Sequence, residues 1–223
     1  MMTAIVVVFA IPGREDTTAA TLAAVDGPGG GWKLTCERVL FWTGTTPPIA
    51  APPGWITIHN NHGNRGSVAA LADFWRVLDV VGDDRDLVFL EDDVLPCRNA
   101  LPYMVAWASP HVTHFFNGSR APHGLRKLPP GGFEFSQTIK IPARIVKALR
   151  ASPATSKGPR DGWDLAIGRQ LAAMGEPLYQ HRSLVQHVGF TSMWQPGNNL
   201  AKRLPASDWP GADFDALTLF ERG

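Results

Sequence analysis

The first half of the chain alternates between continuous apolar runs and amphipathic stretches. Continuous runs rich in β-branched and aromatic residues are typical of strands that are covered on both faces of a sheet. This pattern predicts strands over residues 3–11, 38–44, 55–60 and 86–93. Apolar residues at helical spacing lie between these runs and predict helices over 17–25 and 68–81. Strands that alternate with helices favour an α/β fold, in which helices flank a mostly parallel central sheet.

The second half has shorter segments that Gly and Pro interrupt more often. Its periodicity predicts helices over 101–108, 142–152 and 161–175. The second of these begins at Pro142, a residue that the first turn of a helix tolerates well. Short strands are expected over 111–118, 136–141 and 178–192. Residues 119–135 are predicted to form a loop that ends in a hairpin, and the tail from Trp194 is predicted to be irregular.

Composition limits the class of protein. With 44% apolar residues, the 223 residues are enough for one large domain with a sizeable core. No apolar run approaches the roughly 18 residues of a membrane span, so no membrane insertion is expected. The first residues lack a basic region and a small-residue cleavage site, which favours a buried strand over a signal peptide. Cys36 and Cys97 show no metal-binding or redox spacing and are interpreted as reduced thiols of a cytoplasmic protein.

The net charge of +1 conceals an asymmetry along the chain. Residues 1–100 hold 7 basic and 12 acidic residues, whereas residues 101–203 hold 13 basic and 4 acidic residues. Six basic residues lie between Glu134 and Asp161 without an intervening acid: Lys140, Arg144, Lys147, Arg150, Lys157 and Arg160. Such a field attracts an anionic ligand, and it is equally typical of a solvated basic surface. Both interpretations stay open.

Three adjacent carboxylates, Glu91, Asp92 and Asp93, follow the apolar run Leu87–Leu90. Acids at the end of a buried strand cap local backbone amides, act as a general acid/base pair, or hold a hard cation beside substrate phosphates. A cap is the commonest explanation for such a cluster by itself. The strongly apolar context on both sides favours the cation site here, because a divalent ion relieves the repulsion between the carboxylates.

Three other positions carry chemistry with alternatives that stay open. Asp161 and Asp164 flank Gly162-Trp163 and suit either helix capping or a carboxylate base. Trp163 suits either the core or an apolar platform for a sugar ring. His187 lies in an apolar segment, where a histidine is either a core residue or a neutral metal ligand. The His59/His62 pair is interpreted as part of a turn.

The segment LVFLEDDV (87–94) resembles the Asp-x-Asp element of nucleotide-sugar-dependent glycosyltransferases of the GT-A fold. In that family, the acidic element closes a central strand and binds a divalent metal that bridges the donor diphosphate. The resemblance implies that Asp93 ligates Mn²⁺ or Mg²⁺. It further implies that Glu91 and Asp92 contact ribose, metal-bound water or the donor sugar, with Glu91 as an additional metal ligand.

Other segments resemble further parts of that family in the order it requires. VFAIPGREDTTAATL resembles the first strand, loop and helix, and GNRGS resembles a second segment that lines the nucleotide pocket. GGFEFSQTIKI resembles the loop and strand beside the donor and acceptor sugars. DGWDLAIG resembles the motif of the catalytic base, with Asp164 favoured over Asp161, and SLVQHVGFTS resembles the strand whose histidine, His187, completes the metal site. The implied donor-side residues are Ile11, Pro12, Arg14, Asn64 and Arg65, and the implied acceptor-side residues are Trp163, Phe133, Arg126 and Lys127.

The resemblance implies a single GT-A-like, Rossmann-like domain. Residues 1–95 form its nucleotide-sugar-binding half, 96–195 a smaller acceptor and catalytic half, and 196–223 an irregular tail. The implied activity is a metal-dependent, inverting transfer of a sugar from a nucleotide-diphosphate sugar, such as a UDP-sugar, to a hydroxyl group. The acceptor is either a saccharide or a hydroxymethylated base in DNA. The alternative is a sugar-phosphate nucleotidyltransferase, which uses the same type of sheet and a carboxylate-bound Mg²⁺ but usually a richer phosphate loop than Pro12-Gly13-Arg14.

Overall fold

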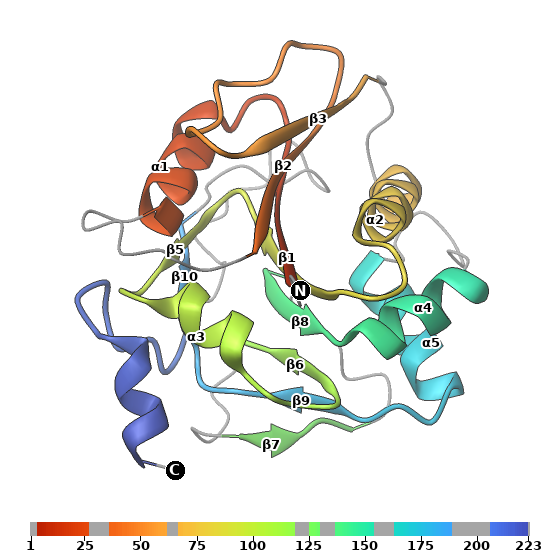
Figure 1. Cartoon of the computed structure of the whole chain (residues 1–223), viewed down its shortest axis with the longest axis vertical. Coiled ribbons are helices and arrows are strands. Elements are labelled where there is room, and N and C mark those ends of the chain that lie inside the picture. Colours follow the sequence, from red (N-terminus) through yellow and green to blue (C-terminus); the bar gives the residue numbers. More distant parts are fainter. Residues whose placement is uncertain are drawn as a thin grey trace.

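A single large sheet runs through the molecule (Figure 1). The computed structural model describes residues 4–26, 36–61, 67–118, 125–129, 137–153, 163–188 and 206–222. Within these residues the sheet has eight strands in the order β3-β2-β1-β4-β8-β6-β9-β7. Its strands are β1 (Ala4–Ala10), β2 (Glu37–Thr43), β3 (Ile56–Asn60), β4 (Asp86–Glu91), β6 (Val112–His114), β7 (Arg126–Lys127), β8 (Thr138–Ile141) and β9 (Leu178–Gln180).

Strand direction confirms the predicted mostly parallel sheet. β1 pairs in parallel with both β2 and β4, and β2 pairs in parallel with β3. β6 pairs in parallel with β9. Only β8 and β7 run against the others, since β8 is antiparallel to both β4 and β6 and β7 is antiparallel to β9. β8 therefore joins the two halves of the chain into one sheet.

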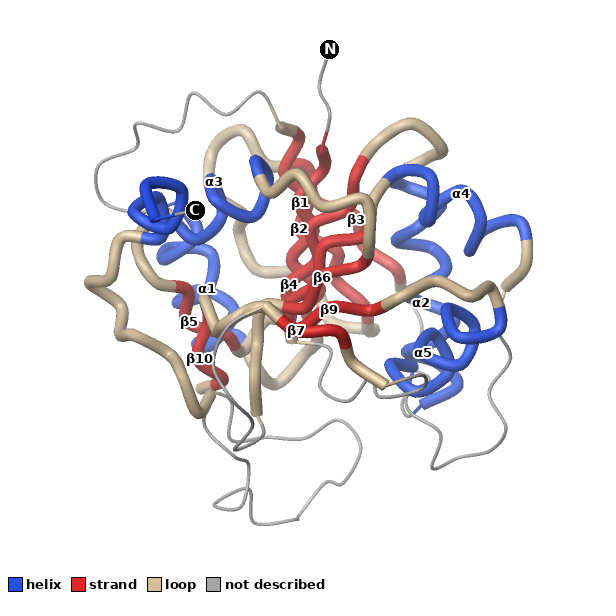
Figure 2. Tube along the Cα trace, turned by 90° about the horizontal axis from the view of Figure 1, so that it is seen from below, coloured by secondary structure: helices blue, strands red, loops and turns tan. Residues whose placement is uncertain are grey.

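Helices cover both faces of the sheet, as Figure 2 shows in a view along it. On one face lie α1 (Glu15–Asp26), α3 (Ala100–Ala106), the 3₁₀ helix η2 (Ala216–Arg222) and a small antiparallel sheet of β5 (Val94–Pro96) and β10 (Val185–His187). On the other face lie α2 (Ser67–Val81), α4 (Ala143–Ala151) and α5 (Trp163–Ala173). No helix among the described residues is long and apolar enough to cross a membrane.

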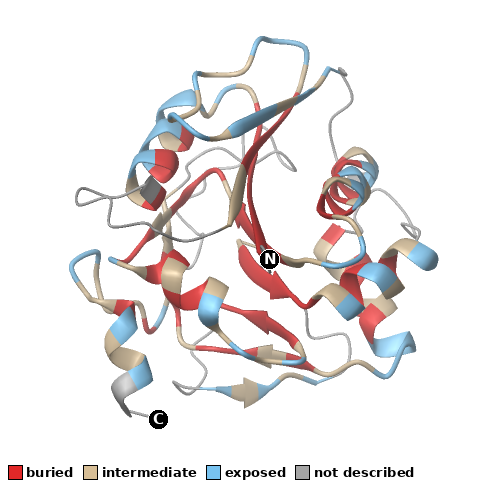
Figure 3. Cartoon of the chain, in the orientation of Figure 1, coloured by how far each residue is buried: buried red, intermediate tan, exposed pale blue. Residues whose placement is uncertain are grey.

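The alternation of side chains along the strands divides the core into two layers. In β1, Ile5, Val7 and Phe9 face α2 and α5, while Val6 and Val8 face α1 and α3. Because both faces are covered, β1 is buried along its whole length, and β4 is buried except at its two end residues (Figure 3). This explains why their sequences read as continuous apolar runs.

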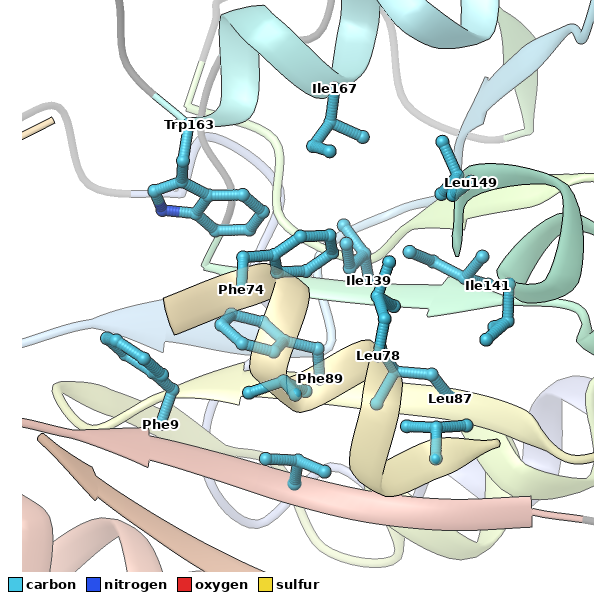
Figure 4. Packing of buried hydrophobic residues seen from close by; sticks show 14 of the residues in the cluster. Phe9, Phe74, Leu78, Leu87, Phe89, Ile139, Ile141, Leu149, Trp163 and Ile167 are labelled. Atoms are coloured by element: carbon cyan, nitrogen blue, oxygen red, sulfur yellow. The ribbon is translucent and has the colours of Figure 1, made fainter. Parts of the chain in front are cut away.

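An aromatic cluster anchors α2 and α5 to the sheet (Figure 4). Phe74 of α2 stacks on Trp163 of α5 with ring centroids 4.5 Å apart, and Phe89 of β4 meets the same indole ring edge to face at 5.2 Å. Phe89 also contacts Phe9 of β1. The start of α5 is therefore held close to the carboxyl end of β4.

Three local predictions differ from the structure. The predicted strand over 86–93 ends at Glu91, because Asp92 and Asp93 form a turn that leads into β5. The predicted strand over 111–118 is regular only over Val112–His114, beyond which the chain leaves the ladder. The tail predicted to be irregular ends in η2, which packs on α3 through Phe220 and Tyr103. Cys36 and Cys97 are free thiols.

We expect the Phe74→Ala substitution to lower the free energy of unfolding by about 3–5 kcal/mol. Phe74 is 1% exposed and contacts both Trp163 and Phe89, so its removal leaves a cavity between the sheet and two helices. Urea denaturation followed by intrinsic fluorescence measures the change. Val68→Ala on the same helix is the control, since Val68 is 61% exposed and its truncation is expected to cost less than about 0.5 kcal/mol. A similar loss in both variants would contradict this packing.

Candidate functional site

The predicted acidic cluster lies at the point where the sheet changes the direction of its winding. From β1 the chain passes through α1 to β2 on one side, and it later returns through α2 to β4 on the other side. β1 and β4 pair in parallel with Phe9 opposite Glu91, so both strands end at the same edge. In open α/β sheets ligands bind outside the carboxyl ends of the strands at such a switch point.

A sharp turn after β4 places three carboxylates in different surroundings. Glu91 ends β4, and Asp92 and Asp93 turn the chain into β5. The Glu91 N–H donates to the Gln137 carbonyl at 2.9 Å, and the Val188 N–H donates to the Asp93 carbonyl at 2.8 Å. The turn is therefore fixed from both sides by backbone hydrogen bonds.

The small sheet brings His187 to the acidic turn. In the β5–β10 pair, His187 lies opposite Val94, one residue beyond Asp93. Its Nε2 lies 3.1 Å from Oδ2 of Asp93. Glu91, Asp93 and His187 each offer one ligand atom, and these atoms lie within 4.8 Å of one another.

This donor set fits a divalent cation. Two carboxylates supply the oxygen ligands that suit Mg²⁺ and Mn²⁺, and the imidazole adds a nitrogen ligand of the kind that transition metals accept. Ligands that share an ion at about 2.0–2.4 Å lie no more than about 4–5 Å apart, which matches the observed cluster. The structure thus brings together the three residues predicted as ligands, and a divalent ion bound between them stays a prediction.

Arg14 supplies the positive charge at this turn. Its Nη1 lies 2.9 Å from Oδ1 of Asp92 and 2.7 Å from Oδ2 of Asp93. The Arg14 side chain is only 8% exposed. Burial acts to lower the pKa of Arg14, but the charges of Asp93 and Asp92 outweigh it and raise that pKa above its usual value. The guanidinium therefore bridges two of the three acids and stays charged.

Asp92 holds the loop after β1 against the acidic turn. Its Oδ2 accepts hydrogen bonds from the Ile11 N–H at 3.0 Å and the Thr18 hydroxyl at 3.3 Å, while its Oδ1 accepts from Arg14. Burial raises the pKa of Asp92 to about 7, with a further contribution from Asp93, and Arg14 opposes both. Both oxygens are engaged within the protein, so the role of Asp92 in this structure is to position the loop. Its contact with the donor stays a prediction.

Two threonines of α1 support the turn and were not singled out from the sequence. The Thr18 hydroxyl contacts Asp92, and the Thr21 hydroxyl lies 3.0 and 2.8 Å from the carbonyl oxygens of Asp92 and Val94. Thr18 lies four residues after Arg14, and Thr21 lies three residues after Thr18. This spacing places all three side chains on one side of the helix start. A row of polar residues at helical spacing in an Ala-rich helix is the sequence pattern that could have predicted their role.

The loop after β1 meets the chain immediately after β2. A Cβ on Gly44 would lie 2.4 Å from Cγ of Pro12, so only glycine permits this close approach. Nε2 of His59 lies 2.8 Å from the Gly44 carbonyl, but His59 belongs to strand β3, so its interpretation as a turn residue was wrong. Ile11 is buried and Pro12 half-buried beside this contact. Asn64 and Arg65, the other predicted donor residues, and His62 lie outside the described residues.

A second, polar junction reinforces the same edge. Asp73 of α2 is buried and accepts hydrogen bonds from Thr43 at the end of β2 and from Asn60 at the end of β3. The carboxyl ends of β2 and β3 are thereby joined to α2. Together with the Pro12–Gly44 contact, this creates a fixed edge beside the acidic turn.

The start of α5 forms the opposite side of the site. Asp164 lies in its first turn and its Oδ1 accepts a hydrogen bond from the Leu165 N–H at 2.9 Å. Trp163 is 5% exposed and packs between Phe74 and Phe89, which favours the core alternative for its ring. Asp161 and Phe133 lie outside the described residues, so the choice between Asp161 and Asp164 as base stays a prediction.

The predicted acceptor-side cations lie on the edge strand β7. Arg126 is half-buried and Lys127 is exposed, and both pair with β9. Lys127 lines a cavity of about 130 Å³ together with Leu128, Gly168 and Pro177. Their contact with an acceptor stays a prediction.

Comparison with solved structures supports the predicted fold. No protein-family model and no curated protein matches the sequence. The mannosyltransferase PcManGT from Pyrobaculum calidifontis, solved in complex with GDP-Man and Mn²⁺, gives a TM-score of 0.50 at 14% identity, over 78% of this chain and 53% of its own. The galactosyltransferase LgtC, solved in complex with donor and acceptor sugar analogs, gives a TM-score of 0.46 at 10% identity, over 74% of this chain and 69% of its own.

The likeness to the mannosyltransferase concerns the fold alone, because the identity is low. The predicted GT-A-like class, a mostly parallel sheet flanked by helices, is confirmed. The chain spans about half the length of the mannosyltransferase that it resembles.

We expect His187→Ala to weaken Mn²⁺ binding by at least about 10-fold, because loss of a ligand costs no less than loss of a residue that supports one. Electron paramagnetic resonance of free Mn²⁺ during titration measures the affinity. His111→Ala is the control, since His111 pairs with Glu176 beyond the amino end of β6, at the opposite edge of the sheet. Equal affinity in the His187 variant and the wild type would exclude His187 as a ligand.

We expect Arg14→Gln to lower the free energy of unfolding in metal-free buffer by about 3–5 kcal/mol, because it leaves two buried carboxylates without their cation. Chemical denaturation in the presence of a chelator measures the change. The control is Arg98→Gln, whose side chain is 63% exposed and lies 3.7 Å from Asp215. That surface pair is expected to contribute less than about 1 kcal/mol. An Arg14 variant as stable as the control would contradict the bridging role.

Proposed function

We propose that the protein is a metal-dependent, inverting glycosyltransferase that moves a sugar from a nucleotide-diphosphate sugar to a hydroxyl group. The observation that carries the proposal is the cluster of Glu91, Asp93 and His187 at the switch point of a GT-A-like sheet. Its ligand chemistry suits a cation that is shared with a diphosphate. The fold likeness to the mannosyltransferase supports the same conclusion.

The parts of the proposed donor lie on different sides of the acidic turn. The fixed edge formed by Ile11, Pro12 and Gly44 receives the nucleoside, next to the ends of β1 and β2. The diphosphate lies over Glu91 and Asp93, which with His187 would hold a divalent ion, and that ion would neutralise the charge that builds on the leaving group. The donor sugar then extends past β4 toward the start of α5.

Arg14 is placed to assist the departing diphosphate. Its guanidinium is held at the acidic turn by Asp92 and Asp93, between the loop that receives the nucleoside and the proposed metal ligands. A guanidinium presents several N–H donors in one plane and matches phosphate oxygens well. Arg14 therefore orients the carboxylates and contributes positive charge to the donor side.

Asp164 is the proposed base. Side-chain alternation places Glu91 on the same face of β4 as Phe89, and Trp163 contacts Phe89, so the start of α5 lies over that face. The Asp164 carboxylate accepts the proton of the acceptor hydroxyl as its oxygen bonds to the anomeric carbon. The bond from that carbon to the diphosphate oxygen breaks in the same step, with its electron pair leaving on the diphosphate. In-line displacement of this kind inverts the anomeric configuration.

The acceptor is proposed to be a saccharide. Three members of the basic run already have acidic partners: Lys140 with Asp86, Arg144 with Glu176, and Arg150 with Asp79 and Asp83. Lys140 is buried and also donates to the carbonyl oxygens of Val105 and Trp107. These cations are engaged within the fold and are therefore less available to bind the phosphates of a polyanionic acceptor such as DNA.

Acceptor binding is expected to depend weakly on salt. A saccharide displaces few counterions, so a plot of log affinity against log salt concentration is expected to have a slope near zero. An acceptor duplex would give a slope of about −0.9 for each phosphate contacted. Fluorescence titration of a glycan panel and of hydroxymethylated duplex DNA at several salt concentrations distinguishes the two acceptors. Tight, steeply salt-dependent binding of the duplex would overturn the saccharide proposal.

The activity itself is tested by nucleotide release. Wild-type protein with Mn²⁺ is expected to release nucleoside diphosphate from at least one member of a panel of UDP-, GDP- and TDP-sugars, faster when an acceptor is present. Asp164→Asn is expected to lower kcat about 100-fold or more, because the acceptor hydroxyl loses its base. The control is Asp79→Asn on the exposed side of α2. Neither binding nor release with any donor would end the proposal.

A further inference from the structure

One polar side chain beside the proposed metal ligands has no part in the mechanism above. Gln137 immediately precedes β8, the antiparallel neighbour of β4. The register pairs Leu90 with Thr138, and the Glu91 N–H donates to the Gln137 carbonyl, so Gln137 lies directly opposite Glu91. Opposed residues of antiparallel strands share a face and lie about 4.5–5.5 Å apart at Cβ.

Alternation along β8 fixes the face on which the Gln137 side chain lies. Ile139 and Ile141 belong to the core layer that contains Phe89 and Trp163 (Figure 4). Gln137, two residues before Ile139, therefore projects to the same side as Glu91. This is the side on which α5 begins with Trp163 and Asp164. Gln137 thus lies between a proposed metal ligand and the helix that carries the proposed base.

The carboxamide oxygen of Gln137 lacks a donor among the described residues. This atom, Oε1, is buried. A buried amide oxygen without a donor destabilises the fold, so a ligand that donates a hydrogen bond to such an atom at the edge of a site gains affinity. The ligand group must donate a hydrogen bond, which a sugar hydroxyl does and a fully ionised phosphate oxygen does not.

Strand order indicates which part of the ligand reaches Gln137. The nucleoside edge lies at β1 and β2, the proposed metal ligands close β4, and Gln137 lies one strand further, at β8. A nucleotide-sugar whose nucleoside lies at β1 and β2 and whose diphosphate lies at β4 has its sugar over β8. We propose that Gln137 binds a hydroxyl group of the donor sugar through its carboxamide and contributes to the choice of sugar. This inference rests on the proposed function.

The decisive variant is Gln137→Met, which keeps the side-chain volume and removes the hydrogen-bonding groups. With Mn²⁺ present, isothermal titration is expected to show a loss of about 3- to 10-fold in affinity for the nucleotide-sugar that the wild type uses, the size of one neutral hydrogen bond. Affinity for the corresponding nucleoside diphosphate is expected to stay unchanged. A deoxy analogue of the donor that lacks the partner hydroxyl is expected to bind both proteins equally.

Two controls separate this role from a structural one. The melting temperature of Gln137→Met is expected to equal or exceed that of the wild type, because an apolar group replaces an unsatisfied buried polar atom. Gln170→Met tests the same exchange on α5, where Gln170 donates to the Ser152 carbonyl, and is expected to leave donor affinity unchanged. Mn²⁺ affinity measured without nucleotide is expected to be the same in wild type and Gln137→Met.

Three results would overturn the inference. Equal affinity of Gln137→Met and wild type for the nucleotide-sugar would exclude the hydroxyl contact while leaving the proposed function intact. A parallel loss for the nucleoside diphosphate, or a loss of Mn²⁺ affinity, would instead make Gln137 part of the metal surroundings. Absence of any nucleotide-sugar binding by the wild type would remove the proposed function, and this inference with it.

Discussion

The ion bridge from Arg14 to Asp92 and Asp93 is the interaction on which the rest of the site depends. It joins the loop after β1 to the turn after β4, two segments 78 residues apart in sequence. Without a cation, three adjacent acids at the end of a buried strand would repel one another, and two of them are almost fully buried. The bridge compensates part of this charge and leaves an excess of negative charge beside His187. A divalent cation is the species that balances such an excess, so the protein's own ion pair and the proposed metal site are two parts of one charge arrangement.

The positions of the surrounding elements follow from this constraint. Asp92 fixes the backbone at Ile11, and the close Pro12–Gly44 contact then fixes the end of β2. The aromatic contacts of Phe89 and Trp163 hold the start of α5 on the same side of β4 as Glu91. The end of β4 is thus bordered by the Pro12–Gly44 contact, by the acidic turn and by the start of α5. Each border rests on packing or on buried hydrogen bonds, which hold a site more accurately than an exposed loop does.

The sequence predicted the central strands and their parallel order because these strands are covered on both faces, which makes their apolar runs continuous. It also indicated that Glu91, Asp93 and His187 belong together, although only the β5–β10 pairing explains how they meet. The short strands β5 and β7 were missed because two or three residues carry too little periodicity to detect. The burial of Trp163 and the loop-holding role of Asp92 depend on partners distant in sequence, Phe74 and Ile11, and no local pattern reveals such contacts.

His187 reaches the acidic turn from 94 residues away, through a small sheet separate from the large one. During synthesis, Glu91 and Asp93 emerge well before this histidine, so a partly made chain has only part of the ligand set. The three side chains come together through the pairing of β10 with β5, two strands that are distant in sequence. The C-terminal segment secures that strand, since the Ala206 N–H donates to Oε1 of Gln186. A divalent ion at the proposed site would therefore meet its complete ligand set only where β10 is paired with β5.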